Sequence, residues 1–177
     1  VSLATGEVVG AEALVRWQHP SKGLIPPAEF IFTAEESGLI KALTEQVLGI
    51  ACRAAARWPE RCGRSPRVAV NLSGRSFADG GIDAMVRQAL AESGLPPQRL
   101  ELEITETVLL ENRETVEAAL SGFNRLGVRN AIDDFGTGYS SLSYLKTFSI
   151  QSLKIDRAFI ADVVEDGNDA AIVRAIV

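Results

Sequence analysis

The chain has 177 residues, of which 46% are hydrophobic and 23% are charged, a composition typical of one soluble globular domain with a sizeable core. Its formal net charge of −5 argues against broad binding to DNA, RNA or anionic lipid, because those partners call for a basic face. One histidine and two cysteines leave little material for a histidine-based metal site, a Ser-His-Asp triad or a disulfide framework.

The first half of the chain alternates strand and helix. Residues 8–17 (VVGAEALVRW) predict a strand, and after a proline-rich loop residues 39–58 carry apolar side chains at helical spacing. Residues 67–73 (RVAVNLS) predict a short β-branched strand. The helix that follows it ends at Gly94.

The second half continues the alternation. Strands are predicted at residues 100–105 (LELEIT), 128–135 (VRNAIDDF) and 152–156 (SLKID). Helices are predicted at residues 113–127, at residues 139–148 and from residue 169 onward. This spacing predicts parallel β/α units, hence a doubly wound sheet or a β/α barrel, with no sign of a second domain.

The compartment is predicted from what the sequence lacks. The two cysteines have no metal-type spacing, and no signal peptide opens the chain. The longest apolar helical pattern, residues 39–58, is interrupted by Lys41, Glu45 and Arg53, so it does not predict a membrane span. We therefore expect a cytoplasmic domain that makes no membrane contact of its own, within a parent protein that could still be tethered to a membrane.

Polar residues interrupt the predicted strands. Parallel strands covered on both faces read as apolar runs, and a carboxylate inside one costs several kcal/mol unless a partner compensates it. The interruptions stand within or at the ends of five strands: Glu12, Asn71, Glu101, Glu103, Asp133, Asp134, Lys154 and Asp156. In a β/α barrel the carboxyl ends of the strands meet at one mouth, so we expect the polar side chains to converge there.

A divalent cation would allow so many carboxylates to lie side by side, because its charge reverses their repulsion. Five of the polar residues are hard oxygen donors that suit Mg²⁺ or Mn²⁺, namely Glu12, Asn71, Glu103, Asp133 and Asp134. Two adjacent aspartates could serve two ions, as in centres that clamp an in-line phosphoryl displacement. The residues alone favour a metal-dependent phosphoryl-transfer or enolising barrel.

Each polar residue also has a purely structural interpretation. A strand-end aspartate is often a cap or turn residue, and Asn71 could cap the next helix. Lys154 could be a snorkelling surface lysine, and Glu106 could be solvated. What favours a site is therefore the joint placement of these residues after successive strands.

Five ordered stretches resemble the EAL domain family of bacterial cyclic-di-GMP phosphodiesterases: GAEALVRWQHP, RVAVNLSGRSF, LELEITET, NAIDDFGTGYSSLSYL and QSLKIDRAFI. Glu12, Ala13 and Leu14 are the triplet that gives the family its name. The resemblance implies a modified TIM-type (β/α)8 barrel. It also implies metal-dependent hydrolysis of cyclic di-GMP to linear pGpG in second-messenger signalling, with two Mg²⁺ or Mn²⁺ ions.

The resemblance implies a role for each candidate residue. The metal ligands would be Glu12, Asn71, Glu103 and Asp133 for the first ion, with Asp133 and Asp134 on the second. Lys154 would be the catalytic lysine that positions the attacking water, and Asp156 would lie close to the same centre. Glu106 would fix the glycine-rich loop DFGTGYSS. Arg16 would hold a substrate phosphate, and Leu14 would be a second substrate-binding residue.

The length departs from the family pattern. A full barrel takes about 250 residues, and we count five of its eight strands here. The expected domain is therefore a partial EAL domain at residues 1–177 that lacks the first strand and the last two strands. The piece could be inactive for that reason alone.

Two other functions stay open. The nearest is a non-catalytic cyclic-di-GMP receptor, although such domains usually lose the triplet glutamate or the paired aspartates, and both are kept here. The other is a regulatory module whose dimer face transmits a signal. The family often dimerises beside the glycine-rich loop, which would put a homodimer contact near residues 134–146. A receptor can bind the nucleotide without divalent ions, whereas a catalyst must turn it over with them.

Overall fold

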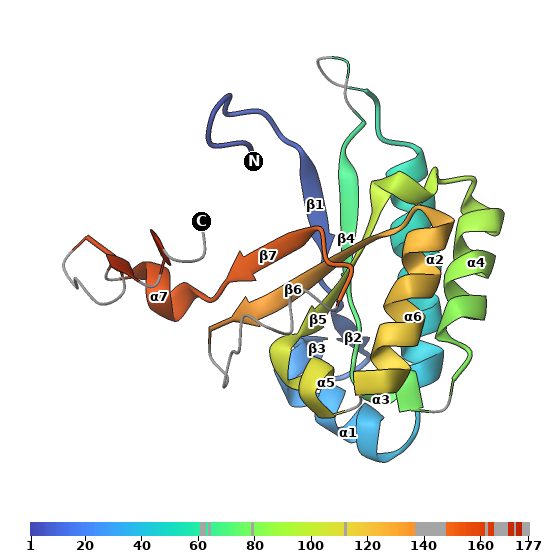
Figure 1. Cartoon of the computed structure of the whole chain (residues 1–177). Helices are drawn as coiled ribbons and strands as arrows, with labels where there is room; N and C mark the ends of the chain where they lie inside the picture. The colour runs from blue at the N-terminus through green and yellow to red at the C-terminus, as the bar shows by residue number, and fades with distance from the viewer. Residues whose placement is uncertain are drawn as a thin grey trace.

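The computed structural model describes residues 1–60, 63, 65–78, 80–111, 113–136, 148–161, 163, 164, 170, 171, 173 and 174. Its centre is a five-stranded parallel sheet (Figure 1). The strands, in spatial order, are β1 (Gly10–Ala13), β4 (Arg67–Asn71), β5 (Leu100–Thr105), β6 (Arg129–Phe135) and β7 (Ser152–Ile155). They turn progressively from β1 to β7, so the sheet curls (Figure 1).

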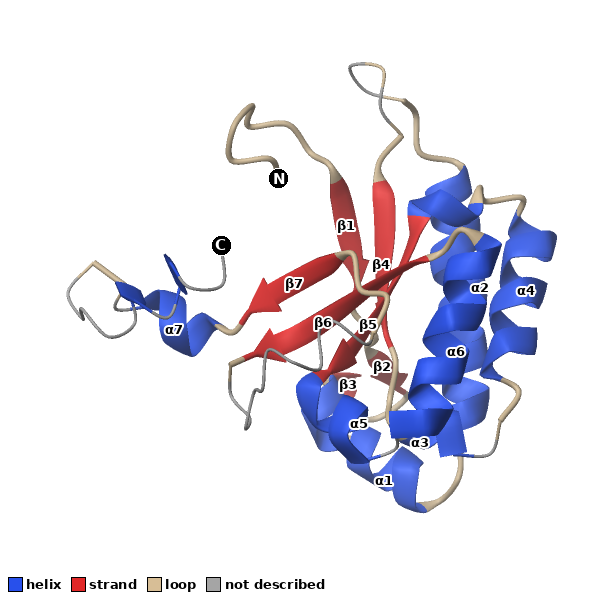
Figure 2. Ribbon diagram, viewed as in Figure 1, coloured by secondary structure: helices blue, strands red, loops and turns tan. Residues whose placement is uncertain are grey.

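Three long helices cover one face of this sheet (Figure 2). They are α2 (Ile40–Ala56), α4 (Ile82–Ser93) and α6 (Arg113–Leu126). The smaller elements are the antiparallel hairpin of β2 (Trp17–His19) and β3 (Gly23–Ile25), the 3-10 turns Pro27–Glu29 and Pro97–Arg99, and the helices α1 (Ile31–Glu36), α3 (Arg75–Ala78), α5 (Glu106–Glu111) and α7 (Arg157–Ala161).

The core lies between the sheet and the long helices. Side chains of a strand alternate between its two faces, and Leu100, Leu102 and Ile104 of β5 are all buried against the helices. Leu48 of α2 and Phe123 of α6 pack into the same cluster and are fully buried. Burial of this apolar layer fixes which face of the sheet turns toward the helices.

The other face of the sheet is polar, which explains why polar residues interrupt the predicted strands. Glu101 and Glu103 alternate with the buried leucines of β5, and so they point away from the long helices. Arg129 and Asp133 of β6 point to this same face of the sheet. The charged residues that interrupt the strands are therefore gathered on one face of a curled sheet rather than buried among the helices.

This architecture is an incomplete TIM-type barrel. Curling, parallel order and helices on a single face distinguish it from a doubly wound sheet, which has helices on both faces. All five predicted strands are present. The predicted helices at residues 139–148 and from residue 169 onward fall wholly or mostly outside the described residues.

The first predicted strand is wrong beyond Ala13. Regular sheet pairing spans only Gly10–Ala13, and the chain then leaves the sheet to form the β2–β3 hairpin. Two backbone N–H groups, of Ser21 and Lys22, donate to Nδ1 of His19 at 3.1 and 3.2 Å and close the turn. The lone histidine is thus a turn-capping residue.

Candidate metal centre

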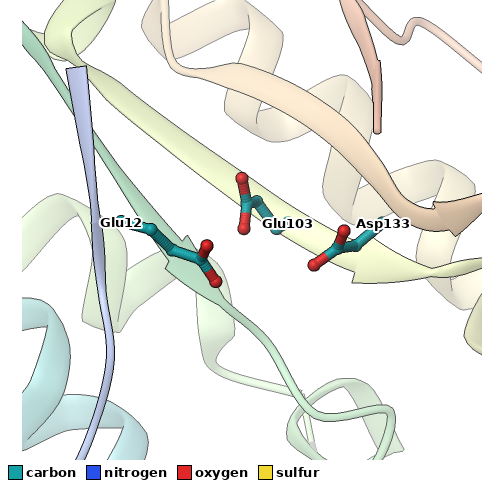
Figure 3. Close-up of side chains that lie close together, drawn as sticks. All are labelled: Glu12, Glu103 and Asp133. Carbon is teal, nitrogen blue, oxygen red and sulfur yellow. The ribbon is translucent and has the colours of Figure 1, made fainter. Parts of the chain in front are cut away.

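Three carboxylates from three strands converge on the polar face of the sheet. They belong to Glu12 of β1, Glu103 of β5 and Asp133 of β6 (Figure 3). One carboxylate oxygen from each lies within 4.8 Å of the other two. The sequence prediction that these side chains meet is confirmed, and the parallel register explains it, because each residue sits in the carboxyl half of its strand.

Lys154 of β7 brings a positive charge to the three carboxylates. Its Nζ lies 2.8 Å from Glu103 Oε2, 3.1 Å from Asp133 Oδ2 and 3.4 Å from Glu12 Oε2. Four strands that are far apart in sequence therefore meet in one ionic cluster. Lys154 is not the snorkelling surface lysine of its structural interpretation.

Asn71 joins the cluster at the carboxyl end of β4. Its Nδ2 donates to Glu12 Oε1 at 2.6 Å, which leaves the amide oxygen as the atom that could serve a cation. The register pairs Asn71 directly with Glu103 on β5, and the next backbone N–H, of Leu72, donates to the Glu103 carbonyl at 2.8 Å. The side chain of Asn71 is thereby held over the same part of the sheet.

Burial and ion pairing shift the pKa values of two groups in the cluster, Glu103 and Lys154. Burial raises the pKa of Glu103 to about 7, although its hydrogen bond and ion pair with Lys154 act in the opposite direction. Burial by itself lowers the pKa of Lys154, but the hydrogen bonds to Glu103 and Asp133 outweigh it and raise that pKa above its usual value. An ammonium group thus compensates carboxylates that would otherwise repel one another.

A bulge in β6 explains the two adjacent aspartates. In a regular strand Asp133 and Asp134 would point to opposite faces, but the pairing with β7 shifts register between Ile132 and Phe135. Asp134 has φ of +53°, and it is the only non-glycine residue with positive φ among those described. Asp133 Oδ1 accepts the N–H of Asp134 at 3.0 Å and supports this turn. The extra residue frees Asp134 from the ordinary alternation.

Asp134 lies beside a second carboxyl group, that of Asp156. Burial raises the pKa of Asp134, and the nearby charges of Asp133 and Asp156 and a hydrogen bond with Asp156 raise it further. Asp156 Oδ1 also accepts the N–H of Ala158 at 2.6 Å at the start of α7. Asp134, the predicted ligand of the second ion, and Asp156, predicted to lie close to the same centre, are therefore neighbours.

Glu106 opens α5 immediately after β5 and is buried, so its solvated interpretation is wrong. Its Oε2 accepts the N–H of Gly136 at 3.3 Å, just after β6. Gly136 has φ of +105°, a conformation that favours glycine. Glu106 thus holds the first glycine of the predicted glycine-rich loop, and residues 137–147, with most of the proposed dimer region, lie outside the described residues.

The two predicted substrate-binding residues are placed differently. Leu14 is exposed and lines a pocket of about 300 Å³ together with Asn71 and Thr105, next to the acidic cluster. Arg16 lines an adjoining groove of about 490 Å³ with Trp17, and its guanidinium donates to the neighbouring Val15 carbonyl at 2.7 Å. The structure brings Leu14 toward the cluster and leaves Arg16 turned into this groove.

Glu101 belongs to a different ionic network, nearer the start of the strands. Its Oε2 lies 3.2 Å from Arg129 Nε and 3.9 Å from Arg67 Nε, and it accepts the hydroxyl of Ser152 at 3.1 Å. The polar face thus carries two layers. One is balanced by arginines, and the other, at the strand ends, is balanced by Lys154 among the residues that the structure describes.

The residues of the second layer fit a divalent ion. Carboxylate and amide oxygens are hard donors, and the convergence of three carboxylates from three strands gives a ligand set of the kind that Mg²⁺ and Mn²⁺ take. Of the two cysteines, Cys52 is a buried free thiol of the core, and Cys62 lies outside the described residues. Within the described part of the chain, no helix is both long and apolar enough to cross a membrane.

Sequence reasoning missed one contact beside this centre. Glu35, at the end of α1, accepts the hydroxyl of Ser73 at 2.5 Å, two residues after Asn71. The sequence shows two adjacent acidic residues, Glu35 and Glu36, just before Ser37 and Gly38 end the helix. Nothing in that pattern points to Ser73 as a partner.

Comparison with known proteins adds three findings. The sequence model of the EAL domain matches residues 1–177. The bifunctional diguanylate cyclase/cyclic di-GMP phosphodiesterase MucR of Pseudomonas aeruginosa is 45% identical over 172 residues, which are 97% of this chain and 25% of MucR. The cyclic di-GMP phosphodiesterase PdeR of Escherichia coli is 45% identical over 97% of this chain and 26% of its own length.

A solved structure of the PaMucR phosphodiesterase in complex with c-di-GMP superimposes with a TM-score of 0.89 and 45% identity. The match covers 97% of this chain and 69% of that one. The chain spans about a quarter of the length of the two curated relatives.

Proposed function

Because the chain belongs to the EAL domain family, we propose that it carries the catalytic centre of a cyclic-di-GMP phosphodiesterase that uses two Mg²⁺ or Mn²⁺ ions. The observation that supports this most directly is the convergence of Glu12, Glu103 and Asp133 within 4.8 Å on one face of the sheet. MucR and PdeR, both 45% identical to this chain, are named as phosphodiesterases of this nucleotide, and the solved PaMucR structure contains it.

The ligand roles follow from the donor chemistry. The first ion would be held by Glu12, Asn71, Glu103 and Asp133, and the second by Asp133 and Asp134. Ions bound there supply Lewis-acid activation of a water molecule and neutralise charge on the phosphate oxygens. The bulge in β6 suits this assignment, because it lets consecutive aspartates serve neighbouring positions.

The reaction is the hydrolysis of one of the two phosphodiester bonds of cyclic di-GMP. The water oxygen forms a new bond to phosphorus, the bond from phosphorus to one ribose oxygen breaks, and that oxygen takes up a proton. The product is linear pGpG. No oxidant or further co-reactant is required.

The chain's own residues would orient this reaction. The Lys154 ammonium already lies within 3.4 Å of all three carboxylates, so it can donate a hydrogen bond to a water molecule among them. Asp156 lies beside Asp134 and shares a hydrogen bond with it, so it would help to hold Asp134 at the second ion. Leu14 would contact the nucleotide from the adjacent pocket, and Arg16 would have to turn toward the mouth to reach a phosphate.

Glu106 would act at one remove, by holding Gly136 and thus the start of the loop that follows Asp134. Two further proposals are a homodimer contact near residues 134–146 and a cytoplasmic location. The dimer contact rests on the family resemblance, and the location rests on the two cysteines without metal-type spacing.

The test is pGpG formation by the full-length protein with Mg²⁺ or Mn²⁺, with and without chelator, followed by chromatography. Glu103→Gln should abolish turnover because it removes a ligand charge with little change in shape. The matched control is Glu101→Gln, two residues earlier on the same face of β5, which should retain turnover. Tight nucleotide binding without product in the presence of both metals would replace the catalyst by a receptor, and equal loss in both variants would refute the assigned centre.

A further inference from the structure

Helix α1 reaches across to the loop that leaves β4. Glu35 Oε1 accepts the Ser73 hydroxyl at 2.5 Å, and Glu36 pairs with the guanidinium of Arg75. Both acidic residues end the same short helix and both partners stand within three residues of each other. The two contacts differ in burial, because the Glu35–Ser73 contact is partly buried whereas Glu36 and Arg75 are more than half exposed.

Ser73 is itself tied to the backbone of this loop. Its Oγ accepts the N–H of Arg75 at 3.2 Å, at the start of α3. The residue before it, Leu72, is held to the Glu103 carbonyl on β5. A side chain that holds Ser73 therefore holds the backbone just after Asn71. The pairing of β4 with β5 holds the backbone before Asn71.

We propose that Glu35 is a positioning residue that sets the place of the Asn71 amide through Ser73. The Asn71 amide is held to Glu12 at 2.6 Å, so a shift of the loop would move the amide away from the carboxylates. A hydrogen bond from a hydroxyl to a carboxylate is about twice as strong as a neutral one, which suits it to this task. Glu35 also lines the pocket that contains Asn71 and Leu14, so it lies near the mouth.

The inference rests on the proposed metal site and specifies what supports it from outside the ligands. Partners that orient metal ligands typically contribute about 10- to 100-fold in metal affinity. Since Glu35 acts through one intermediate residue, we expect the lower end of that range. An exposed ion pair such as Glu36–Arg75 contributes little, because solvent screens it.

The test is Mn²⁺ binding to the full-length protein without nucleotide, by calorimetry, together with thermal unfolding in chelator. Glu35→Ala should weaken Mn²⁺ binding roughly tenfold, and Glu35→Gln, which keeps an acceptor for Ser73, should restore most of it. The matched control Glu36→Ala, on the same helix and facing the same loop, should stay within about twofold of wild type.

The outcomes distinguish failure of the Glu35 positioning role from failure of the proposed metal site. Equal Mn²⁺ affinity of wild type and Glu35→Ala would overturn the positioning role while leaving the metal site intact. The same tenfold loss in Glu36→Ala would also overturn it, because the effect would then belong to α1 in general. Absence of Mn²⁺ binding by wild type would refute the metal site and the inference together. If Glu35→Ala does not fold, Ser73→Ala decides, since it removes the hydroxyl that donates to Glu35: a roughly tenfold loss of Mn²⁺ affinity is expected, and unchanged affinity would overturn the positioning role.

Discussion

Lys154→Met isolates the charge that balances the acidic cluster. Methionine keeps much of the length and apolar stem of lysine and removes only the ammonium group. In the structure that ammonium makes three ion pairs, the shortest to Glu103 at 2.8 Å. The Glu103 side chain is only 2% exposed, so the substitution would leave its buried charge without the ammonium group that now pairs with it.

The expected cost follows from the burial of the two partners. Removing one partner of a fully buried ion pair costs about 3–5 kcal/mol. Lys154 is 34% exposed, and solvent screening reduces the figure, so we expect about 2 kcal/mol at neutral to alkaline pH in the absence of metal. For a chain of this size each kcal/mol shifts the melting temperature by about 2–4 °C, which predicts a decrease of about 4–8 °C.

The loss should depend on pH. The Lys154 contacts lower the pKa of Glu103, which burial raises to about 7, so the substitution raises that pKa further. Near pH 5.5 Glu103 is then protonated in both proteins and the difference between them is small. Near pH 8 the wild-type carboxylate is charged and paired, whereas the variant carboxylate is not, and the difference is largest.

The assay is thermal unfolding of the purified protein, followed by circular dichroism at pH 5.5 and pH 8 in chelator and again with saturating Mn²⁺. Mn²⁺ should narrow the gap, because a bound cation stabilises the folded state and supplies the missing positive charge. Lys41→Met, at an exposed lysine of α2, is the control for loss of a lysine charge. Equal melting temperatures of Lys154→Met and wild type at pH 8 in chelator would refute this reasoning.

Three further predictions test other parts of the site. Asp134→Asn should reduce pGpG formation by about 100-fold or more, because asparagine has no negative charge to offer the second ion. The circular dichroism spectrum should stay unchanged, because asparagine tolerates the positive φ of this position; full turnover would contradict the two-ion assignment. Without metal, the free energy of unfolding should fall as pH rises from about 4.5 to about 7, because the raised pKa of Glu103 means that the folded state binds its proton more tightly; urea titrations in chelator across this range would check it, and a rise attributable to Glu103 would contradict it. Glu101→Gln should lower the free energy of unfolding by about 1–2 kcal/mol, because it leaves Arg129 with a weaker partner, without changing pGpG formation well below the melting temperature; urea titration beside the turnover assay would reveal any contrary effect.

The five strands and the acidic convergence were predictable from the sequence. Apolar runs that end in polar residues mark each strand, and parallel pairing brings their carboxyl ends together whatever the loops between them do. Glu12, Glu103 and Asp133 could therefore be assigned to one cluster before any geometry was known. Local composition and one topological rule were sufficient.

The hairpin and the polar face were not predictable in the same way. Residues 8–17 predict one strand, and nothing local in the sequence marks Ala13 as its end, whereas in the structure the chain goes on into the β2–β3 hairpin, whose turn His19 closes. The polar interruptions of the strands were visible in the sequence, but that they share one face left without helices was not, because strands covered on both faces are the usual case for a parallel sheet. The sequence of β5 alternates, as a sheet with one helix-covered face requires.

Contacts between side chains far apart in sequence were also beyond prediction. Lys154 could be assigned to the site by resemblance, but not its position within 3.4 Å of three carboxylates. The contact of Glu35 with Ser73 joins positions 38 residues apart and leaves no local pattern. Such contacts depend on how separate elements come together in the fold, which no periodicity in the chain encodes.

The left-handed backbone at Asp134 favours the proposed function at the expense of stability. Aspartate tolerates positive φ less well than glycine does, so glycine at this position would relieve the backbone and also remove one of the mutually repelling carboxylates. Directed evolution for heat resistance alone would therefore be drawn to Asp134→Gly, and the same step would discard a carboxylate of the second layer. Attempts to harden this domain should hold residue 134 fixed and look for their gains elsewhere, such as among the exposed side chains of the long helices.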